Sequence, residues 1–421
     1  MFKLILNCFA VLFISASSLS AQWVQSTGIP QSHVVYSIIQ CSGKLFAATG
    51  VVNLEYGAIL SSTDNGVSWG NVDVNQPNLS AVMCLVVKGT YIFAGTYRDG
   101  LLISSNAGNN WIRTDVTTAG SIFQITICGN NIVCYTTGNG PSRISTDNGA
   151  TWNTVSENVL KYVNSFLTIG NTFYAGAEKG LAFSIDDGLT WSLAANNGIP
   201  FDGNGQKLIY SLVSHDGKIF ANCQQKIFYT TDNGNNWIAT NISLSNFGRV
   251  YSMISYNGKI FGSMYGLSDT ARGVITTTNN GINWSNLNTG MPGPPSVRSL
   301  FINNEFLLAG TYSGTIYRMP LSAVTGLNNS PEIVKHFSLQ QNYPNPFNPE
   351  TKINFVINKK DLVSLKVYGS DGKLVFSLVN KEVEVGNYSF TFSGENLPSG
   401  IYFYELKAGA ISDTKKMILV K

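Results

Sequence analysis

The chain has 421 residues, of which 44% are hydrophobic and 12% charged, and its formal net charge is +3 at pH 7. This composition is typical of a well-buried globular protein of two domains, and it excludes an intrinsically disordered chain. So small a charge excess does not indicate a nucleic-acid groove or a polybasic membrane patch, and we expect no nucleic-acid partner.

Residues 1–21 have the layout of a cleaved secretory signal peptide. Lys3 precedes an apolar run over residues 4–14, and small residues follow up to Ala21, after which we place the cleavage. No later stretch is long and apolar enough to span a bilayer, so we expect no transmembrane span in the mature chain. The cysteines that remain are odd in number and lack the spacing of a disulfide framework, so we predict buried thiols. They are Cys41, Cys84, Cys128, Cys134 and Cys223.

Seven tryptophans recur through residues 22–321 at intervals of 39 to 47 residues. Six of them end one motif, which reads STDNGVSW at residues 62–69, SSNAGNNW at 104–111 and STDNGATW at 145–152. Apolar segments with period-two alternation lie between the motifs and predict strands. The interval is the one expected for a four-stranded blade of a β-propeller.

The repeat count predicts where the ring closes. The last repeat follows Trp284 and lacks a terminal motif, whereas the mature chain begins with an unaccompanied Trp23 in WVQSTGIP. The amino-terminal strand is therefore expected to complete the seventh blade, which leaves few open sheet edges. The predicted fold class is all-β: a seven-bladed β-propeller over residues 22–321, whose N-terminal strand closes the last blade, followed by a small antiparallel β-sandwich.

The motif S-x-D-x-G-x-x-W resembles the Asp-box, or BNR repeat, of sialidases and other secreted propellers. The resemblance implies a hairpin between the third and fourth strands of a blade, on the face opposite the active site. The residue types agree with a structural role, because Asp or Asn can accept backbone N–H groups, glycine adopts positive φ, and tryptophan packs between blades. The residues given this role are Asp64, Gly66, Trp69, Asn106, Gly108, Trp111, Asp147, Gly149, Trp152, Asp186, Gly188, Trp191, Asp232, Gly234, Trp237, Asn279, Gly281 and Trp284.

The motifs also have some likeness to oxygen-rich calcium loops. Asn106 and Asn279 replace the aspartate in two copies, and no distal glutamate recurs at a fixed offset, so the structural interpretation is favoured. The three histidines offer neither a catalytic triad nor a zinc site. We therefore predict no metal and no cofactor.

Function is expected on the face opposite the motifs, where the loops between second and third strands gather with those after each outer strand. Tyrosines beside arginines there could bind sugars or a peptide carboxylate, although a solvated rim with ordinary turn chemistry is an equal alternative. The candidate ligand-binding residues are Glu55, Tyr56, Tyr97, Arg98, Asp99, Tyr265, Asp269, Arg272, Arg298 and Tyr312.

An extracellular glycoside hydrolase, sialidase-like or polysaccharide-degrading, is the alternative function. Arg98, Arg249, Arg272 and Arg298 could approach one face, as the resemblance to sialidases would require. However, the Arg-Ile-Pro sequence of that family is absent before the first motif, and sialidases have six blades. The polysaccharide hydrolases with this motif place their two carboxylates between a pair of propellers, and one is predicted here. We therefore assign no catalytic residue and favour a non-enzymatic protein.

Residues 322–336 break the repeat and carry Gly, Asn, Ser and Pro as a linker does. Residues 337–421 alternate strand-like segments with Gly or Pro turns, which predicts a small antiparallel sandwich. The sequences QNYPNPFNP, LPSGIYFYEL and KKMILVK occur there in order, and this segment resembles the type A C-terminal sorting domain of the type IX secretion system. An ordinary carbohydrate-binding sandwich is the alternative.

The sorting-domain resemblance implies a Gram-negative bacterium, contact with the type IX machinery through residues 337–421, and release or attachment at the outer cell surface. Together with the repeats, it predicts a secreted or cell-surface β-propeller that binds a glycan or a protein.

Overall fold

The structure is a computed structural model that describes residues 22–114, 116, 121–136, 142–155, 159–242, 248–266, 272–325, 337–357, 360–384, 386–408 and 411–421. The predicted signal peptide and residues 326–336 of the predicted linker lie outside these ranges. The described chain consists of β-strands and one five-residue helix, which confirms the all-β prediction. It divides into two compact units, Met1–Leu327 and Asn328–Lys421, which are described separately.

Seven antiparallel sheets of four strands make up the described part of the first unit, and each is named here by its first strand. In six of them the four strands follow one another in sequence and in space. Their bounds are β2 (His33–Cys41), β3 (Lys44–Val51), β4 (Gly57–Ser62) and β5 (Gly70–Asn71); β6 (Val82–Lys88), β7 (Tyr91–Thr96), β8 (Leu101–Ser104) and β9 (Ile112–Thr114); β10 (Ile122–Cys128), β11 (Asn131–Thr136), β12 (Arg143–Ser145) and β13 (Asn153–Thr154); β14 (Ser165–Ile169), β15 (Thr172–Ala177), β16 (Gly180–Ser184) and β17 (Ser192–Leu193); β18 (Ile209–His215), β19 (Lys218–Cys223), β20 (Lys226–Thr230) and β21 (Ile238–Ala239); and β22 (Arg249–Tyr256), β23 (Lys259–Tyr265), β24 (Gly273–Thr277) and β25 (Ser285–Asn286).

The seventh sheet combines both ends of the unit. It contains β26 (Val297–Ile302), β27 (Phe306–Thr311), β28 (Ile316–Pro320) and, beside β28, the N-terminal strand β1 (Val24–Gln25). Val24 pairs with Arg318. The preceding Trp23 donates from its backbone N–H to Thr289 O at 2.9 Å and from its indole Nε1 to Leu287 O at 2.6 Å.

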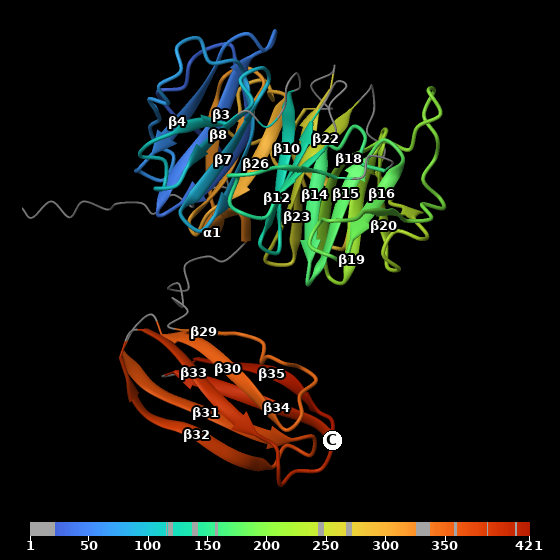
Figure 1. The fold of residues 1–421 in the computed structure, drawn as a ribbon. Helices are drawn as coiled ribbons and strands as arrows, with labels where there is room; N and C mark the ends of the chain where they lie inside the picture. The colour runs from blue at the N-terminus through green and yellow to red at the C-terminus, as the bar shows by residue number, and fades with distance from the viewer. Residues whose placement is uncertain are drawn as a thin grey trace, which may run out of the picture. The chain divides into compact units, whose positions relative to one another are not determined.

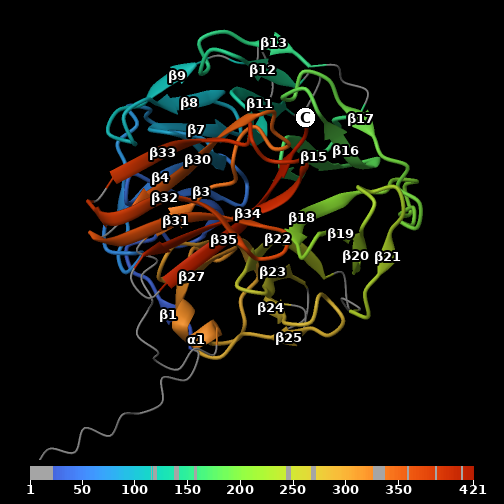
Figure 2. The ribbon, with the colours of Figure 1, turned by 90° about the horizontal axis from the view of Figure 1, so that it is seen from below.

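The sheets follow one another around a common centre, with their first strands innermost (Figures 1 and 2). Side-chain hydrogen bonds join neighbouring first strands: Ser211 Oγ donates to Val250 O at 2.6 Å, and Ser299 Oγ donates to Val35 O at 2.8 Å. The second bond connects β26 with β2, the last of the first strands with the earliest.

The apolar core lies between the sheets rather than in one central cluster. Leu308 of β27, for example, packs with Leu45 of β3 in the next sheet. Second strands are therefore covered on both faces, and β3 is buried at every position except its two ends. Such strands need no alternation of apolar and polar residues.

The five described cysteines are buried and free, as predicted. Cys134 pairs with Ile125 across the β10–β11 hairpin, whereas Cys128 pairs with Asn131. A bridge between Cys128 and Cys134 would not fit this register.

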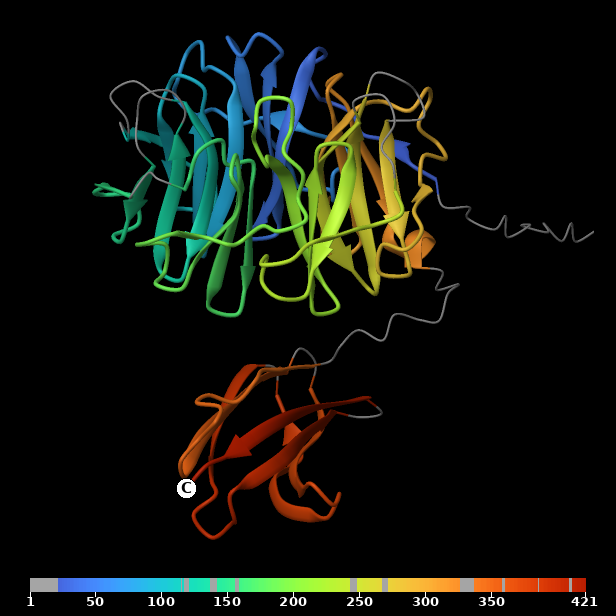
Figure 3. The same ribbon diagram turned by 90° about the vertical axis from the view of Figure 1, so that its right-hand side faces the viewer.

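The antiparallel order gives the first unit two different ends (Figure 3). One carries the turns between first and second strands, such as 42–43, and the motif turns, such as 63–68; we call it the motif face. The other carries the loops between second and third strands, such as 97–100 and 312–315, and the connections from each fourth strand to the next sheet; we call it the loop face.

Helix α1 (Leu321–Thr325) follows β28 at the motif face. Its Leu321 and Val324 are buried against Met319 and Leu307 of the β26 sheet. The linker predicted over residues 322–336 is therefore wrong in residues 322–325, because these apolar side chains pack on the first unit.

The second unit is a pair of antiparallel sheets around one apolar core. One sheet has the order β29 (Phe337–Leu339), β30 (Glu350–Ile357), β33 (Gly386–Ser393); the other has the order β32 (Leu374–Val383), β31 (Asp361–Gly369), β34 (Gly400–Ala408), β35 (Ile411–Leu419). Buried and less buried residues alternate along β30, as in a strand with one face on a core. Phe355, Val367 and Tyr404 are among the buried residues. This arrangement agrees with the predicted sandwich.

Candidate ligand-binding site

The Trp-ending motifs form tight turns held by their own side chains. In the β4–β5 turn, Ser62 Oγ accepts the N–H of Gly66 at 2.9 Å and donates to Asp64 Oδ1 at 2.7 Å. The Asp64 carboxylate accepts the N–H of Ser68 at 3.0 Å. Asn106 and Asn279 accept the equivalent N–H groups at 2.9 Å through their amide oxygens. The turn therefore needs an oxygen acceptor at this position rather than a charge.

Two consecutive residues of each motif have positive φ, whereas the sequence analysis assigned this conformation to the glycine alone. Asn65 has a φ of 54° before Gly66, and Ala107 has a φ of 55° before Gly108. A Cβ on Gly108 would stand 2.4 Å from the ring of Phe46 in the neighbouring sheet. Glycine is thus required by the packing between sheets as well as by the turn.

The motif tryptophans fasten the same turns. In five motifs the indole Nε1 donates to the carbonyl of the motif glycine, as from Trp111 to Gly108 at 3.2 Å and from Trp191 to Gly188 at 3.1 Å. In the first motif, Ser26 Oγ donates to Gly66 O at 2.5 Å instead, and Trp69 Nε1 has no acceptor among the described residues. The segment after Trp23 therefore replaces the indole at that carbonyl.

The loop face carries other side chains than the motif face does. Their positions depend on irregularities in the pairing of the first strands. Six of the seven first strands shift register against their second strands near the loop face. Each shift skips one residue, and a β-bulge of this kind changes the direction of a side chain. The skipped residues are Tyr36, Met83, Phe123, Tyr210, Tyr251 and Arg298.

Four of these side chains belong to one continuous group, which we call the tyrosine–arginine arc. The arc extends over the β18, β22, β26 and β2 sheets. It consists of Tyr36, Tyr210, Arg249, Tyr251, Tyr265, Arg298 and Tyr312.

Tyr251 is the centre of the arc. Its ring centroid lies 6.0 Å from that of Tyr210, 5.9 Å from Tyr265 and 6.2 Å from Tyr312. The rings of Tyr265 and Tyr312 are closer still, at 4.7 Å. Such ring pairs each contribute about 0.5–1.5 kcal/mol beyond burial, so the arc is a packed aromatic surface rather than a set of loose loops.

Both arginines of the arc stack on tyrosine rings. Arg298 Cζ lies 4.3 Å from the centroid of Tyr251 and 5.9 Å from that of Tyr36, and Arg249 Cζ lies 4.7 Å from the centroid of Tyr210. Neither arginine forms an ion pair within the described chain. Burial raises the pKa of Tyr312 well above its ordinary value, although the charge of Arg298 opposes this. The phenol therefore stays neutral near pH 7.

Arg298, Tyr36 and Tyr251 line a cavity of about 300 Å³ among the first strands. Its other lining side chains are apolar or uncharged, and they include Gln124, Asn164 and Ser252. The cavity is therefore cationic on one side and neutral on the other.

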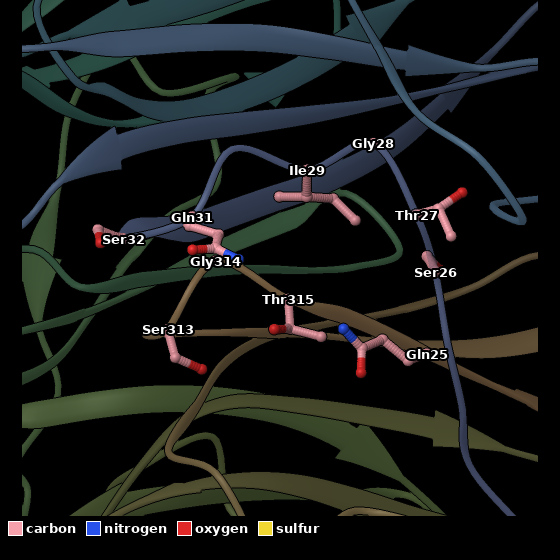
Figure 4. A pocket seen from close by; sticks show the side chains of 10 residues that line it. All are labelled: Gln25, Ser26, Thr27, Gly28, Ile29, Gln31, Ser32, Ser313, Gly314 and Thr315. Atoms are coloured by element: carbon pink, nitrogen blue, oxygen red, sulfur yellow. The ribbon is translucent and has the colours of Figure 1, made fainter.

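A second cavity of about 600 Å³ lies between the segment from β1 to β2 and the β27–β28 loop (Figure 4). Its lining includes Gln25, Gln31, Ser32, Ser313 and Thr315, which are polar but uncharged. Ser313 of this lining follows Tyr312 of the arc directly in sequence.

The structure brings three of the candidate residues, Tyr265, Arg298 and Tyr312, together in the arc. Tyr97 and Arg98 form a separate pair on the β6 sheet, with the guanidinium 5.2 Å from the ring centroid. Asp99 accepts the N–H of Ser80 at 2.8 Å. This carboxylate therefore joins the β7–β8 loop to the segment before β6, and it also lies 3.8 Å from Arg113 of β9.

Two further candidates, Glu55 and Tyr56, lie in the loop between β3 and β4. Glu55 accepts from Asn53 Nδ2 at 3.1 Å, and Tyr56 lines a further cavity between β4 and the segment 71–79. Arg272 donates from Nε to Gly266 O at 2.8 Å. Asp269 lies outside the described residues.

Sequence analysis missed Tyr36, Tyr210 and Tyr251 as site residues, and it considered Arg249 only within a possible arginine cluster. A signal was present, because the triplets VYS, IYS and VYS recur at 35–37, 209–211 and 250–252, each early in a first strand. The bulge that redirects the tyrosine depends on pairing with another strand.

Among the described residues, no three His, Cys, Asp or Glu side chains lie close enough to hold a metal ion. No helix in the described ranges has the length and apolar character needed to cross a membrane.

Residues 341–421 match the secretion system C-terminal sorting domain. The chain therefore carries a type IX sorting domain at its C-terminal end and is exported to the cell surface or secreted. Comparison with curated proteins finds no match.

Several solved structures share the fold. PorZ, an essential bacterial surface component of the type-IX secretion system of Porphyromonas gingivalis, is 15% identical with a TM-score of 0.54, over 92% of this chain and 59% of PorZ. YCF48 bound to D1 peptide is 14% identical with a TM-score of 0.56, over 74% of this chain and 97% of YCF48. The extracellular domain of BT4673 from B. thetaiotaomicron is 14% identical with a TM-score of 0.54, over 79% of this chain and 44% of BT4673. At these identities the likeness shows a propeller-like fold alone.

Proposed function

We propose that the protein is a seven-bladed Asp-box β-propeller, carried outward by its sorting domain, that binds a glycan or protein ligand on its loop face. In this proposal the signal peptide is residues 1–21, the propeller begins at residue 22, and the sorting domain is residues 337–421. The propeller extends to residue 325, because α1 packs on it. The pairing of β1 with β28 and the Ser299–Val35 hydrogen bond support closure of the ring.

The tyrosine–arginine arc is the observation that carries the ligand-binding proposal. Bulges in successive first strands direct tyrosine and arginine side chains to one mouth, where they are partly accessible and line a cavity. Tyrosine and arginine are the residue types enriched where proteins hold ligands and partners. The motif residues, in contrast, are fully engaged in their own turns.

A binding role is favoured over hydrolysis because the described arc lacks a pair of carboxylates. Glycoside hydrolysis generally needs two such groups about 5–9.5 Å apart on either side of the sugar bond. The described carboxylates of the loop face, such as Asp99 and Glu55, are held by their own loops. PorZ is a surface component and YCF48 is seen with a bound peptide, and these relatives of the fold also agree with binding.

The test is a glycan array and a protein pull-down with the purified chain, comparing Tyr251→Ala with Tyr229→Ala. Tyr229 is an equivalent half-buried tyrosine, 5.8 Å from Phe220, near the motif end of β20. We expect Tyr251→Ala to weaken capture by about tenfold or more, as for truncated interface tyrosines, and Tyr229→Ala to leave it unchanged.

The same preparation should give no turnover on sialosides or β-glucans. A hydrolytic rate that is lost on substitution of Glu55, Asp99 or Asp269 would overturn the binding proposal in favour of the glycoside hydrolase. Capture that depends on the second unit alone would also contradict it.

A further inference from the structure

The guanidinium of Arg298 has no hydrogen-bond acceptor in the described chain, although the side chain is half-buried among first strands. Its Cζ lies 4.3 Å from the ring centroid of Tyr251 and 5.9 Å from that of Tyr36. A guanidinium stacked on rings presents its N–H groups at its edge. An arginine has five such donors, and Arg298 is among the residues that line the cavity.

No described acidic side chain neutralises this charge. The lining of the cavity contains no Asp or Glu. The carboxylate of Asp202, which acts electrostatically on Tyr210, accepts the N–H groups of Asn204 and Gln206 at 2.8 Å each. Arg249 brings a second positive charge to the same arc, where it donates a hydrogen bond to Tyr251 Oη at 3.5 Å. Among the residues that the structure describes, the arc therefore has no anion of its own.

A group of tyrosine rings, tilted by 45° to 68° against one another, lies beside the guanidinium. Tyr265 and Tyr312 lie 4.7 Å apart, and both contact the Tyr251 ring on which Arg298 stacks. The C–H face of a saturated ring can pack on such tyrosines while their phenol groups exchange hydrogen bonds with hydroxyls. A forked guanidinium in turn binds a carboxylate through two parallel hydrogen bonds.

The size of the cavity narrows the choice of ligand. About 300 Å³ is at the lower end of the range for small-molecule sites and suits a compact ring rather than a length of peptide. The cavity between Gln31 and Thr315 borders the arc at Ser313 and offers neutral amides and hydroxyls, which suit further hydroxylated units.

We propose that the tyrosine–arginine arc binds a sugar residue that bears a carboxylate, with the carboxylate on Arg298 and the pyranose ring on the tyrosines. This inference rests on the ligand-binding function proposed above and names the ligand class. The chemistry is shared by uronic acids within polysaccharides and by sialic acids at the ends of glycans, and no covalent step is involved.

The test measures binding of the purified full-length chain by calorimetry to four probes: trigalacturonate, its methyl ester, sialyllactose and an acidic peptide of equal charge. The ester keeps the sugar ring and removes the charge. We expect trigalacturonate or sialyllactose to bind at least about tenfold more tightly than the ester and the peptide. Whichever acid binds identifies the source of the carboxylate.

Arg298→Gln is expected to lose this preference, and Arg298→Lys to recover only part of it because an ammonium lacks the fork. Arg318→Gln is the matched control, since Arg318 stacks on Phe306 at 5.1 Å on β28 and does not line the cavity. This control should bind as the unmodified chain does. Unfolding curves of all variants separate lost binding from lost folding.

Three outcomes would overturn the inference: equal binding of the acid and its ester, undiminished binding by folded Arg298→Gln, or binding of the acidic peptide in preference to both sugars. If neither acidic sugar binds but a neutral glycan is captured through Tyr251, the inference fails while the proposed function stands. If nothing is captured through the loop face, both fail.

Discussion

Trp23 shows how one residue near the N terminus completes a sheet formed by the end of the first unit. Its side chain is 1% exposed, and it is packed with Met291, Val297 and Met319. Its indole N–H and its backbone N–H both donate to carbonyl oxygens of residues that lie more than 260 positions later. The neighbouring Val24, the first residue of β1, is 49% exposed. Substitutions at the two residues therefore distinguish the contribution of core packing from that of strand pairing.

We predict that Trp23→Ala lowers the free energy of unfolding by about 3–5 kcal/mol, because it leaves a large cavity between the β26 and β22 sheets. Val24→Ala should change it by less than about 0.5 kcal/mol. Urea unfolding followed by far-UV circular dichroism measures both. Similar values for the two variants would mean that Trp23 is not part of the packed core.

At the scale of the element, the motif turn combines a local hydrogen-bond pattern with contact to the next sheet. The carboxylates of Asp64, Asp147 and Asp232 lie at the surface, yet their pKa values are lowered to about 2. Hydrogen bonds from the residue four positions later are the main cause, from side chain and backbone together. These carboxylates are therefore exposed to solvent and still accept the hydrogen bonds that hold their turns.

These pKa values predict an acid-sensitive window. In the unfolded chain such carboxyls titrate near 3.9, so between pH 4 and pH 2 the unfolded state binds more protons than the folded state. Stability should hold above pH 4 and fall as the pH is lowered towards 2. The urea midpoint at pH 5 and at pH 2.5 measures this loss.

The control for the acid window is a triple variant with Asp64→Asn, Asp147→Asn and Asp232→Asn. Asparagine already serves at residues 106 and 279, so the turns should persist. The variant should lose less of its urea midpoint on acidification. An unchanged loss would assign the acid sensitivity to other groups.

The contact between sheets gives a third prediction. Gly108→Ala places a Cβ 2.4 Å from the Phe46 ring at a φ of 80°, whereas Gly89→Ala places one in open space at a φ of 63°. Gly89→Ala should cost about 1–2 kcal/mol for the left-handed conformation alone. Gly108→Ala should cost about 1–3 kcal/mol more from overpacking. If thermal unfolding showed equal losses of stability for the two variants, the sheets would have to move apart at this contact to accommodate the added methyl group.

At the scale of the whole molecule, binding and export belong to different units. The arc and the seven four-stranded sheets of the first unit lie within residues 24–320, and the sorting domain matches residues 341–421. Each unit has its own apolar core in the described chain. Removing the second unit should therefore leave the first folded.

We predict that deletion of residues 337–421 leaves the first unit folded but inside the cell envelope. Protease accessibility on intact cells measures surface exposure, and the circular dichroism of the purified fragment measures folding. Deletion of residues 359–360 between β30 and β31 serves as a control for shortening as such. A truncated chain that still reached the surface would contradict the sorting assignment.

Sequence alone predicted the all-β class, the strand order within each repeat and the sorting domain, because these depend on local patterns. The arc was predicted only in part. Tyr265 and Tyr312 follow second strands and were found from their loops, whereas Tyr251 is redirected by a bulge that depends on strand pairing. Glu55 and Tyr56 were selected because their loop is long. The length of a loop does not determine the direction in which the loop projects.

The hydrogen bonds of residues 23–27 determine how late the first unit can complete its fold. Besides completing the β26 sheet, this segment exchanges hydrogen bonds with the β4–β5 turn, from Thr27 N–H to Val67 O at 3.0 Å and from Trp69 N–H to Thr27 O at 3.0 Å. At a synthesis rate of about 5–20 residues per second, the acceptor of the Trp23 indole, 264 residues later, emerges roughly 13–53 s afterwards. During that interval the Trp23 side chain cannot reach its position in the core. A chaperone that covers this side chain would be most needed then.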